Sequence, residues 1–215
     1  MYPLYIFDLD GTLVDSLRDL AESANALLVA CGGAPLEHDA VARMVGEGVG
    51  TLVARVFEAG GVERPPDAID RFVKIYDEQL LVHTRPYEGI EAVLDVLGSA
   101  SRLAVLTNKP RQPTLRILAG LGLSRHFDED AIVAGDGPLP RKPDPAGLRL
   151  LASRARVEPG EALLVGDSAI DWQTALNAGA SVCIARYGFG YHSIARNMLE
   201  SIERLIETPR DLLAL

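Results

Sequence analysis

The sequence predicts an α/β fold in which a doubly wound parallel sheet carries an inserted helical domain. Two observations support this prediction. Short apolar runs alternate with stretches of helical periodicity, and one connection is much longer than strand-to-helix loops usually are. The 215 residues, of which 48% are hydrophobic and 24% charged, are enough for one large core or for a core domain with a small second one.

The predicted strands are short apolar runs that end abruptly in small or polar residues. They are too short for helices and apolar on both faces, which is typical of strands buried in a parallel sheet. Five such runs cover residues 4–7, 103–106, 132–134, 163–165 and 182–185. Because ligands bind beyond the carboxyl ends of the strands in such a sheet, the polar residues that follow these runs should converge at one edge.

The predicted helices of the core fall between these strands. Their apolar residues recur at helical spacing over residues 88–98, 112–120, 145–154 and 169–178. Strands and helices therefore alternate along the chain, as a doubly wound fold requires.

The long connection follows the first strand and runs from residue 16 to residue 82. Helical spacing appears in it over residues 16–29, 39–45, 51–59 and 66–82, separated by clusters of Gly and Pro. We expect residues 16–82 to form a helical cap domain, and residues 1–15 and 83–215 to form the core. A cap inserted there would cover a site at the end of the first strand and exclude water, with hinges near residues 13–16 and 82–86.

Two carboxylates, Asp8 and Asp10, directly follow the first predicted strand and precede Gly11 and Thr12. An Asp that attacks phosphorus needs Mg²⁺ to reduce the repulsion between two anions. A second Asp can protonate the leaving oxygen and later deprotonate water, and Gly11 lets backbone amides approach phosphate oxygens. On its own, this segment could equally be a tight Asp-Gly turn with two solvated acids.

Three later segments carry groups that suit metal-assisted phosphoryl transfer. A hydroxyl and an amide can bind phosphate oxygens, a lysine in a proline-stiffened loop can act as a fixed charge, and acids after a strand suit Mg²⁺. The residues are Thr107, Asn108, Lys142, Asp167 and Asp171. Taken singly, Lys142 could be a solvated surface lysine, and Asp167 could cap the helix that starts near residue 169.

Together, these segments resemble the four motifs of the haloacid dehalogenase-like (HAD) hydrolase superfamily. Residues 8–16 (DLDGTLVDS) resemble the first motif, 107–109 (TNK) the second, 142–143 (KP) the third and 165–171 (VGDSAID) the fourth. All four occur in order at the ends of predicted strands, and they cover nearly the whole chain. The resemblance implies a Rossmann-like core with an inserted cap, and bound Mg²⁺ as cofactor.

The resemblance also implies roles for individual residues. Asp8 would be the nucleophile and a Mg²⁺ ligand, Asp10 the general acid and base and a ligand through its backbone carbonyl, and Asp167 the third protein ligand. Asp171 would lie behind the metal or bind it through water, and would orient Lys142. The transferring phosphoryl group would be held by Lys142, Gly11, Thr12, Thr107 and Asn108.

Within the predicted cap, residues 43–52 (RMVGEGVGTL) resemble the cap segment of phosphoglycolate phosphatases. No strand precedes these glycines, so the pattern does not fit a dinucleotide-binding loop. We expect Arg43, Gly46 and Gly48 to reach over the site and contact the non-phosphate end of the substrate. The alternative is a glycine turn between helices without substrate contact. For Lys109, a surface salt bridge and a substrate contact are equally good interpretations.

These features predict a Mg²⁺-dependent phosphatase that hydrolyses a small phosphomonoester, with 2-phosphoglycolate as the leading substrate, through a phospho-aspartate on Asp8. Pyrophosphatase, sugar-phosphate phosphatase and β-phosphoglucomutase-like activities are the alternatives. Gly-Thr after Asp10, where the mutases have Gly-Val, favours hydrolysis. A non-catalytic regulatory or binding protein on this scaffold would have lost a catalytic residue, whereas Asp8, Asp10, Lys142 and Asp167 are all present.

Overall charge and apolar length bear on partners and location. The formal net charge of −9 argues against a nucleic-acid-binding protein, which needs a basic face. No apolar stretch approaches the length of a membrane helix, and the N-terminal residues lack the basic region of a signal peptide. We therefore expect a cytoplasmic protein, monomeric or homodimeric, whose partner is a small phosphorylated metabolite.

Overall fold

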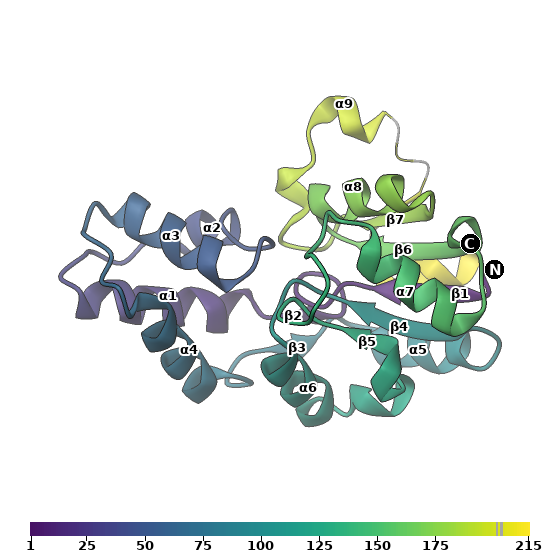
Figure 1. Cartoon of the computed structure of the whole chain (residues 1–215), viewed down its shortest axis with the longest axis horizontal. Coiled ribbons are helices and arrows are strands. Elements are labelled where there is room, and N and C mark those ends of the chain that lie inside the picture. The colour runs from purple at the N-terminus through teal and green to yellow at the C-terminus, as the bar shows by residue number, and fades with distance from the viewer. Residues whose placement is uncertain (201, 203) are drawn as a thin grey trace.

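The computed structural model describes residues 1–200, 202 and 204–215. Its centre is a six-stranded sheet in which neighbouring strands are parallel (Figure 1). The strand order is that of a doubly wound sheet, and it confirms the predicted fold class. From one edge to the other the strands are β5 (Ile132–Val133), β4 (Arg102–Leu106), β1 (Leu4–Phe7), β6 (Ala162–Gly166), β7 (Ser181–Ala185) and β8 (Leu205–Ile206).

Strand β1 lies in the middle of the sheet, which explains why its run is apolar on both faces. Leu4 and Ile6 belong to one hydrophobic cluster, and Tyr5 and Phe7 belong to another on the opposite face. Each of these side chains is at most 1% exposed. Full burial of such a side chain contributes roughly 1.5–3 kcal/mol to folding, so composition alone favours a central position for this strand.

Two layers of helices cover the sheet. Helices α5 (Ile90–Gly98) and α6 (Arg111–Gly120) pack on the face that carries Tyr5 and Phe7, and α7 (Ala146–Ala155) and α8 (Ala169–Ala178) pack on the other face. All four lie where the sequence predicts helices. The remaining short elements are η1 (Leu123–His126), η2 (Glu129–Ala131), η3 (Pro159–Glu161), η4 (Tyr191–Ser193), α9 (Arg196–Leu199) and η5 (Pro209–Ala214).

Four further helices lie together beyond one end of the sheet (Figure 1). They are α1 (Leu17–Ala30), α2 (His38–Ala42), α3 (Val49–Gly60) and α4 (Ala68–Gln79). Helix α1 packs against the other three, and Leu27, Phe57 and Phe72 are among the buried side chains between them. These helices occupy the region in which the sequence predicts a cap. That residues 16–82 form a separate domain that moves over the core stays a prediction.

The two connections between the sheet and these helices pair with each other. Strands β2 (Val14–Asp15) and β3 (Arg85–Pro86) form a short antiparallel ladder. The buried carboxylate of Asp19, on α1, accepts hydrogen bonds from the backbone N–H groups of His83 and Thr84, each at 2.8 Å, and from the Thr84 hydroxyl at 2.6 Å. The first helix of the insertion is thereby tied to the segment that returns to the sheet.

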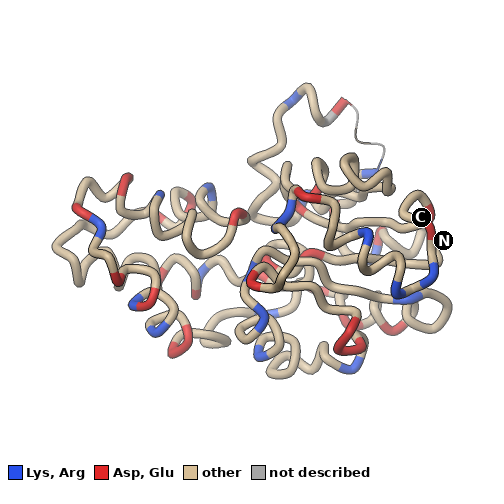
Figure 2. Tube along the Cα trace, in the orientation of Figure 1, with Lys and Arg blue, Asp and Glu red and all other residues tan. Residues whose placement is uncertain are grey.

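Charged residues of both signs are interspersed along the chain, over the sheet and its helices as well as over α1–α4 (Figure 2). Cys31 and Cys183 are free thiols. In the described part of the chain, no helix combines the length and the apolar character that a membrane crossing requires.

Candidate active site

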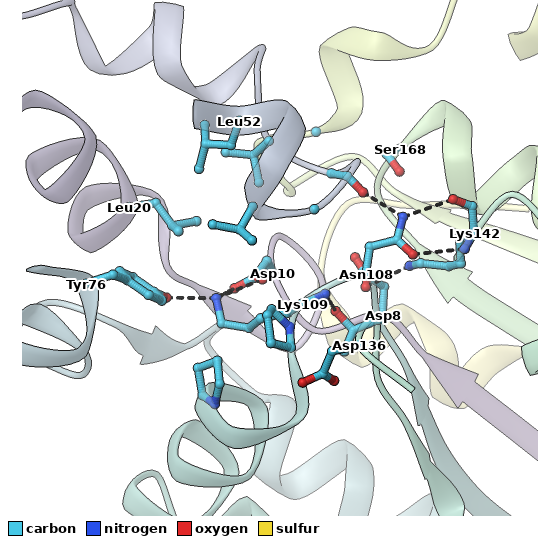
Figure 3. Close-up of a pocket in the computed structure, with 18 of the residues that line it drawn as sticks. Asp8, Asp10, Leu20, Leu52, Tyr76, Asn108, Lys109, Asp136, Lys142 and Ser168 are labelled. Carbon is cyan, nitrogen blue, oxygen red and sulfur yellow. Dashed lines mark hydrogen bonds and ion pairs between the residues drawn. The ribbon is translucent and has the colours of Figure 1, made fainter. Parts of the chain in front are cut away.

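Polar residues follow β1, β4 and β6 at the edge of the sheet that faces the inserted helices. They line a cavity of about 310 Å³ between this edge and helices α1, α3 and α4 (Figure 3). The predicted site residues on this cavity are Asp8, Asp10, Gly46, Gly48, Thr107, Asn108, Lys142 and Asp167. The arrangement follows from topology, because the carboxyl ends of neighbouring parallel strands meet at one edge.

Three buried carboxylates cluster at this edge. Oxygen atoms of Asp8, Asp167 and Asp171 lie within 4.8 Å of one another. Burial raises the pKa of Asp8 to about 7, although the neighbouring Lys142 ammonium opposes the shift. Burial, with the charges of Asp171 and Asp8, also raises the pKa of Asp167 well above its usual value. Such a set of carboxylate oxygens fits a hard divalent cation such as Mg²⁺, whose charge would favour the ionised forms.

Lys142 is a buried lysine that bridges two of these carboxylates, Asp8 and Asp171; Figure 3 shows Lys142 beside Asp8. Its Nζ lies 2.8 Å from Asp8 Oδ1 and 2.6 Å from Asp171 Oδ1, and its side chain is 3% exposed. Burial alone would lower the pKa of Lys142, but the charges of Asp171 and Asp8 raise it above the usual value, so the ammonium stays charged. This excludes the solvated surface lysine that the sequence left open.

Asp171 is held in place at the start of helix α8. Its Oδ2 accepts hydrogen bonds from the Ser168 N–H at 3.1 Å and the Ser168 hydroxyl at 2.6 Å, while Oδ1 accepts one from Lys142. Ser168 is the N-cap residue of α8 and forms a capping box with Asp171. Asp167 is therefore not the cap of this helix. Its Oδ2 accepts a hydrogen bond from the Gly190 N–H at 2.7 Å instead.

The Asn108 amide connects three segments of the chain. Its Nδ2 donates to the carbonyl oxygens of Gly46 at 2.9 Å and Lys142 at 3.0 Å, and its Oδ1 accepts from the Lys142 N–H at 2.8 Å. Both amide N–H groups are thus engaged with backbone carbonyls. In this conformation the side chain holds the Lys142 loop and the glycine loop that precedes α3. The adjacent Thr107 lines the cavity, and its hydroxyl accepts a hydrogen bond from the Lys109 N–H at 3.1 Å.

Asp10 pairs with a second buried lysine, Lys109. The Lys109 Nζ lies 3.0 Å from both carboxylate oxygens of Asp10, and the Ser16 hydroxyl donates to Asp10 Oδ1 at 2.6 Å. On the cap side, Lys109 donates to the Tyr76 hydroxyl at 2.7 Å (Figure 3). Its Nζ lies 4.6 Å from the centre of the Tyr76 ring. Since the Lys109 side chain is 5% exposed, this contact is not a surface salt bridge.

The predicted cap residues differ in their positions. Gly46 and Gly48 line the cavity with φ values of 119° and 91°, which favour glycine. Gly48 directly precedes α3, and a Cβ there would lie 2.8 Å from the guanidinium of Arg141. Arg43, by contrast, is exposed at the end of α2 and is not part of the cavity lining.

Gly11 and Thr12 are likewise not among the residues that line the cavity. The Gly11 N–H donates to the Val14 carbonyl at 2.9 Å, within the turn that follows β1. Gly11 has a φ of 92°, and a Cβ there would lie 2.0 Å from an oxygen of Asp167. Glycine at this position therefore makes room for Asp167. The Thr12 carbonyl accepts a hydrogen bond from the Tyr187 hydroxyl at 3.1 Å.

Sequence reasoning missed two groups of lining residues. The cap contributes an apolar set: Leu20, Val45, Val49, Leu52, Phe72 and Val73. The segment after β7 contributes Phe189 and Gly190, and there Gly188 packs so closely that a Cβ would lie 2.2 Å from the Gly11 carbonyl oxygen. The sequence signal for this segment is the alternation of glycine and aromatic residues over 187–191 (YGFGY).

Comparison with known proteins agrees with these motifs. Residues 5–185 match the family model described as haloacid dehalogenase-like hydrolase. A phosphoglycolate phosphatase of Rhodospirillum rubrum is 44% identical over 199 residues, which cover 88% of this chain and 82% of the relative. A plasmid-encoded phosphoglycolate phosphatase of Cupriavidus necator is 39% identical over 188 residues, covering 86% of this chain and 80% of the relative.

A solved structure gives the same result for the fold. The crystal structure of a predicted phosphoglycolate phosphatase from Haemophilus somnus matches with a TM-score of 0.91 at 30% sequence identity, over 99% of this chain and 97% of that chain. The two relatives are named as phosphatases, and each alignment covers most of this chain and most of the relative. The chain therefore belongs to the haloacid dehalogenase-like hydrolase family and is an enzyme of its phosphatase group, as the four sequence motifs predicted.

Proposed function

We propose that this phosphatase hydrolyses 2-phosphoglycolate with the help of Mg²⁺, through a phospho-aspartate formed on Asp8. The observation that carries the proposal is the cluster of Asp8, Asp167 and Asp171, with the buried Lys142, at the edge of the sheet that faces the inserted helices. The names of the relatives from Rhodospirillum rubrum and Cupriavidus necator support the choice of substrate.

The metal ligands in this proposal are one carboxylate oxygen each from Asp8 and Asp167 and the backbone carbonyl of Asp10. Burial raises the pKa values of Asp8 and Asp167, so a bound cation would lower the cost of ionising both carboxylates, which supports this assignment. Mg²⁺, when bound, would reduce the repulsion between the Asp8 carboxylate and the phosphate dianion and would polarise a phosphate oxygen.

The proposed chemistry has two steps on Asp8. In the first, an Asp8 oxygen bonds to phosphorus as the ester bond breaks, and Asp10 gives a proton to the leaving oxygen. In the second, Asp10 takes a proton from a water molecule that attacks phosphorus, which releases phosphate and restores Asp8. Lys142 and the Thr107 hydroxyl stabilise the phosphoryl oxygens during both steps.

The cap side of the cavity supports a small leaving group. Apolar side chains such as Leu20, Leu52 and Phe72 make up most of its lining, and Tyr76 and Asp77 are its polar groups on helix α4. Because few groups on this side can bind sugar hydroxyls, the lining favours a small leaving group over a sugar. Gly46 and Gly48 line the cavity, and in this proposal their backbone groups contact the substrate. A role for Arg43 would require it to move from its exposed position.

The test is phosphate release from a panel of phosphomonoesters with Mg²⁺, beside the variant Asp8→Asn. We expect preferred hydrolysis of 2-phosphoglycolate, loss of activity in EDTA, recovery with added Mg²⁺ and no turnover by Asp8→Asn. Equal turnover of many esters would remove the substrate assignment, and activity that is indifferent to chelation would remove the metal assignment. No turnover of any ester would favour the regulatory alternative.

A further inference from the structure

The cavity holds few positive charges, and this limits how it can recognise an anionic leaving group. Among the described lining residues, the cationic side chains are those of Lys109 and Lys142. Lys142 is committed to Asp8 and Asp171, at 2.8 and 2.6 Å. Arg43 is exposed and off the lining. If the substrate carries a second negative charge apart from the phosphate, Lys109 is therefore the cationic lining residue that can bind it.

Lys109 lies where it could bind a negative charge on the leaving group. It pairs with Asp10, which in the proposed function protonates the oxygen that joins the phosphoryl group to the leaving group. A charged group one or two bonds beyond that oxygen would lie close to the Lys109 ammonium. The other neighbour of the ammonium is the Tyr76 hydroxyl on helix α4, at 2.7 Å, and the lining that α1, α3 and α4 contribute around it is apolar except for Asp77. The leaving group thus enters between Asp10, Lys109 and the cap.

The present ion pair also blocks Asp10. Both of its carboxylate oxygens lie 3.0 Å from the Lys109 Nζ, and one of them also accepts a hydrogen bond from Ser16. To reach the leaving oxygen, one Asp10 oxygen has to turn away from Lys109. A buried ammonium that loses its anion is strongly disfavoured unless another anion replaces it. A carboxylate on the leaving group can take that place, and an uncharged group cannot.

We propose that Lys109 selects phosphomonoesters whose leaving group carries a carboxylate next to the ester oxygen, by exchanging its ion pair with Asp10 for one with that carboxylate. The exchange seats the substrate and frees Asp10 in the same event. This inference rests on the proposed function and specifies its substrate class. It assigns Lys109 the role of a specificity determinant, which separates its contribution from that of Lys142 at the phosphoryl group.

The experiment compares two substrates of similar size, 2-phosphoglycolate and 2-hydroxyethyl phosphate, in which a hydroxymethyl group replaces the carboxylate. Values of kcat and KM are measured for the wild type and for Lys109→Gln, with Lys74→Gln as a control on the exposed side of α4. We expect the wild type to prefer 2-phosphoglycolate by roughly 100-fold in kcat/KM, the scale expected when a buried charge loses its partner. In Lys109→Gln the preference should fall toward one, mainly through slower turnover of 2-phosphoglycolate. The control should keep the wild-type preference.

The outcomes separate this inference from the proposed function. If the wild type does not prefer the carboxylate ester, the 2-phosphoglycolate assignment fails and the inference fails with it. If the wild type prefers it and Lys109→Gln keeps the same preference, or slows both substrates by one factor, the inference alone is overturned. Should thermal unfolding show that Lys109→Gln does not fold, Lys109→Arg takes its place. The planar guanidinium of Arg does not fit the same point between Asp10 and Tyr76. In Lys109→Arg, kcat/KM for 2-phosphoglycolate should therefore fall by a larger factor than kcat/KM for 2-hydroxyethyl phosphate. Equal factors for the two substrates would overturn the inference.

Discussion

The side-chain amide of Asn108 donates a hydrogen bond to the Gly46 carbonyl oxygen, 2.9 Å away, and so joins the end of β4 to the glycine loop of the cap. The same amide holds the backbone of Lys142 on both its N–H and its C=O. One neutral side chain therefore links the glycine loop before α3, the segment that follows β4 and the loop of Lys142. This makes Asn108 a positioning residue for Lys142, and its hydrogen bond to Gly46 ties the inserted segment to the carboxyl end of β4.

We expect Asn108→Ala to lower kcat/KM by roughly 10–100-fold, because it removes three hydrogen bonds of about 1 kcal/mol each that place Lys142 and the glycine loop. The free energy of unfolding should fall by about 1–3 kcal/mol. Phosphate release and urea unfolding measure the two effects. Asn197→Ala, at an exposed amide on α9, serves as the control. An Asn108→Ala enzyme with wild-type kcat/KM would show that this bridge has no part in catalysis.

We expect Asp8→Asn to abolish turnover while the protein stays folded. The amide is similar in size to the carboxylate but does not attack phosphorus, so neither step of the reaction can begin. Single-turnover measurements with radiolabelled phosphate ester, followed by acid quench, should detect labelled wild-type protein and unlabelled Asp8→Asn. Labelling of the variant at the wild-type level would place the nucleophile elsewhere.

The stability of the metal-free protein should decrease as the pH rises. The pKa of Asp8 is raised from 3.8 to about 7 and that of Asp167 is raised too, so between about pH 4 and pH 7 the folded state binds protons that the unfolded chain releases. Stability that is present below pH 4 is therefore lost over this interval, on the order of a few kcal/mol.

Urea unfolding in EDTA, at pH values across this interval, measures the effect. The Asp8→Asn variant, which lacks one of the titrating carboxyls, should show a flatter profile, and the difference between the two profiles isolates Asp8. Added Mg²⁺ should stabilise the wild type more at the upper end of the interval than at the lower end, because it binds ionised carboxylates. Identical profiles for the two proteins would contradict the shift assigned to Asp8.

Gly188 lies outside the four motifs, yet we expect Gly188→Ala to weaken Mg²⁺ binding at the site. A Cβ at this position would lie 2.2 Å from the Gly11 carbonyl oxygen and 2.3 Å from the Asp167 Cβ, so the backbone on one side has to move. We expect a larger Mg²⁺ concentration for half-maximal activity, because Asp167 is displaced. In Gly160→Ala, where the nearest atom to the new Cβ is 3.6 Å away, activity and its Mg²⁺ dependence should remain normal. Normal Mg²⁺ dependence in Gly188→Ala would separate this loop from the metal site.

Much of the core could be predicted from the sequence because its signals are local. Strand β1 has the predicted bounds, since a central strand must be apolar on both faces, and α8 has them because Ser168 and Gly179 mark its ends. The sequence pattern did not predict the ladder of β2 with β3 or the edge strand β8. Each of these three strands has two residues, too few to show a hydrophobic period, and their pairing is set by the packing of distant segments.

The site was predictable in its charged residues and less so in their partners. The four motifs name Asp8, Asp10, Lys142 and Asp167, but no local pattern says that Lys109 is buried against Tyr76, which comes from another part of the chain. In the sequence, Tyr76 looks like any aromatic residue one helical turn after Phe72. Pairs of this kind depend on how helices α1–α4 lie against the sheet. This arrangement is set by tertiary packing and leaves no local pattern in the sequence.

The central position of β1 has a consequence for how the protein is made. This strand is synthesised before its two neighbours, which begin at Arg102 and Ala162, so more than 150 further residues must be made before both of its edges are paired. The helices of the insertion are complete much earlier and consist of local contacts, which form quickly. During translation, this strand, which is buried on both faces in the folded protein, therefore has unpaired edges while the helical segment that follows it is already able to fold. In this interval the nascent chain is most exposed to aggregation.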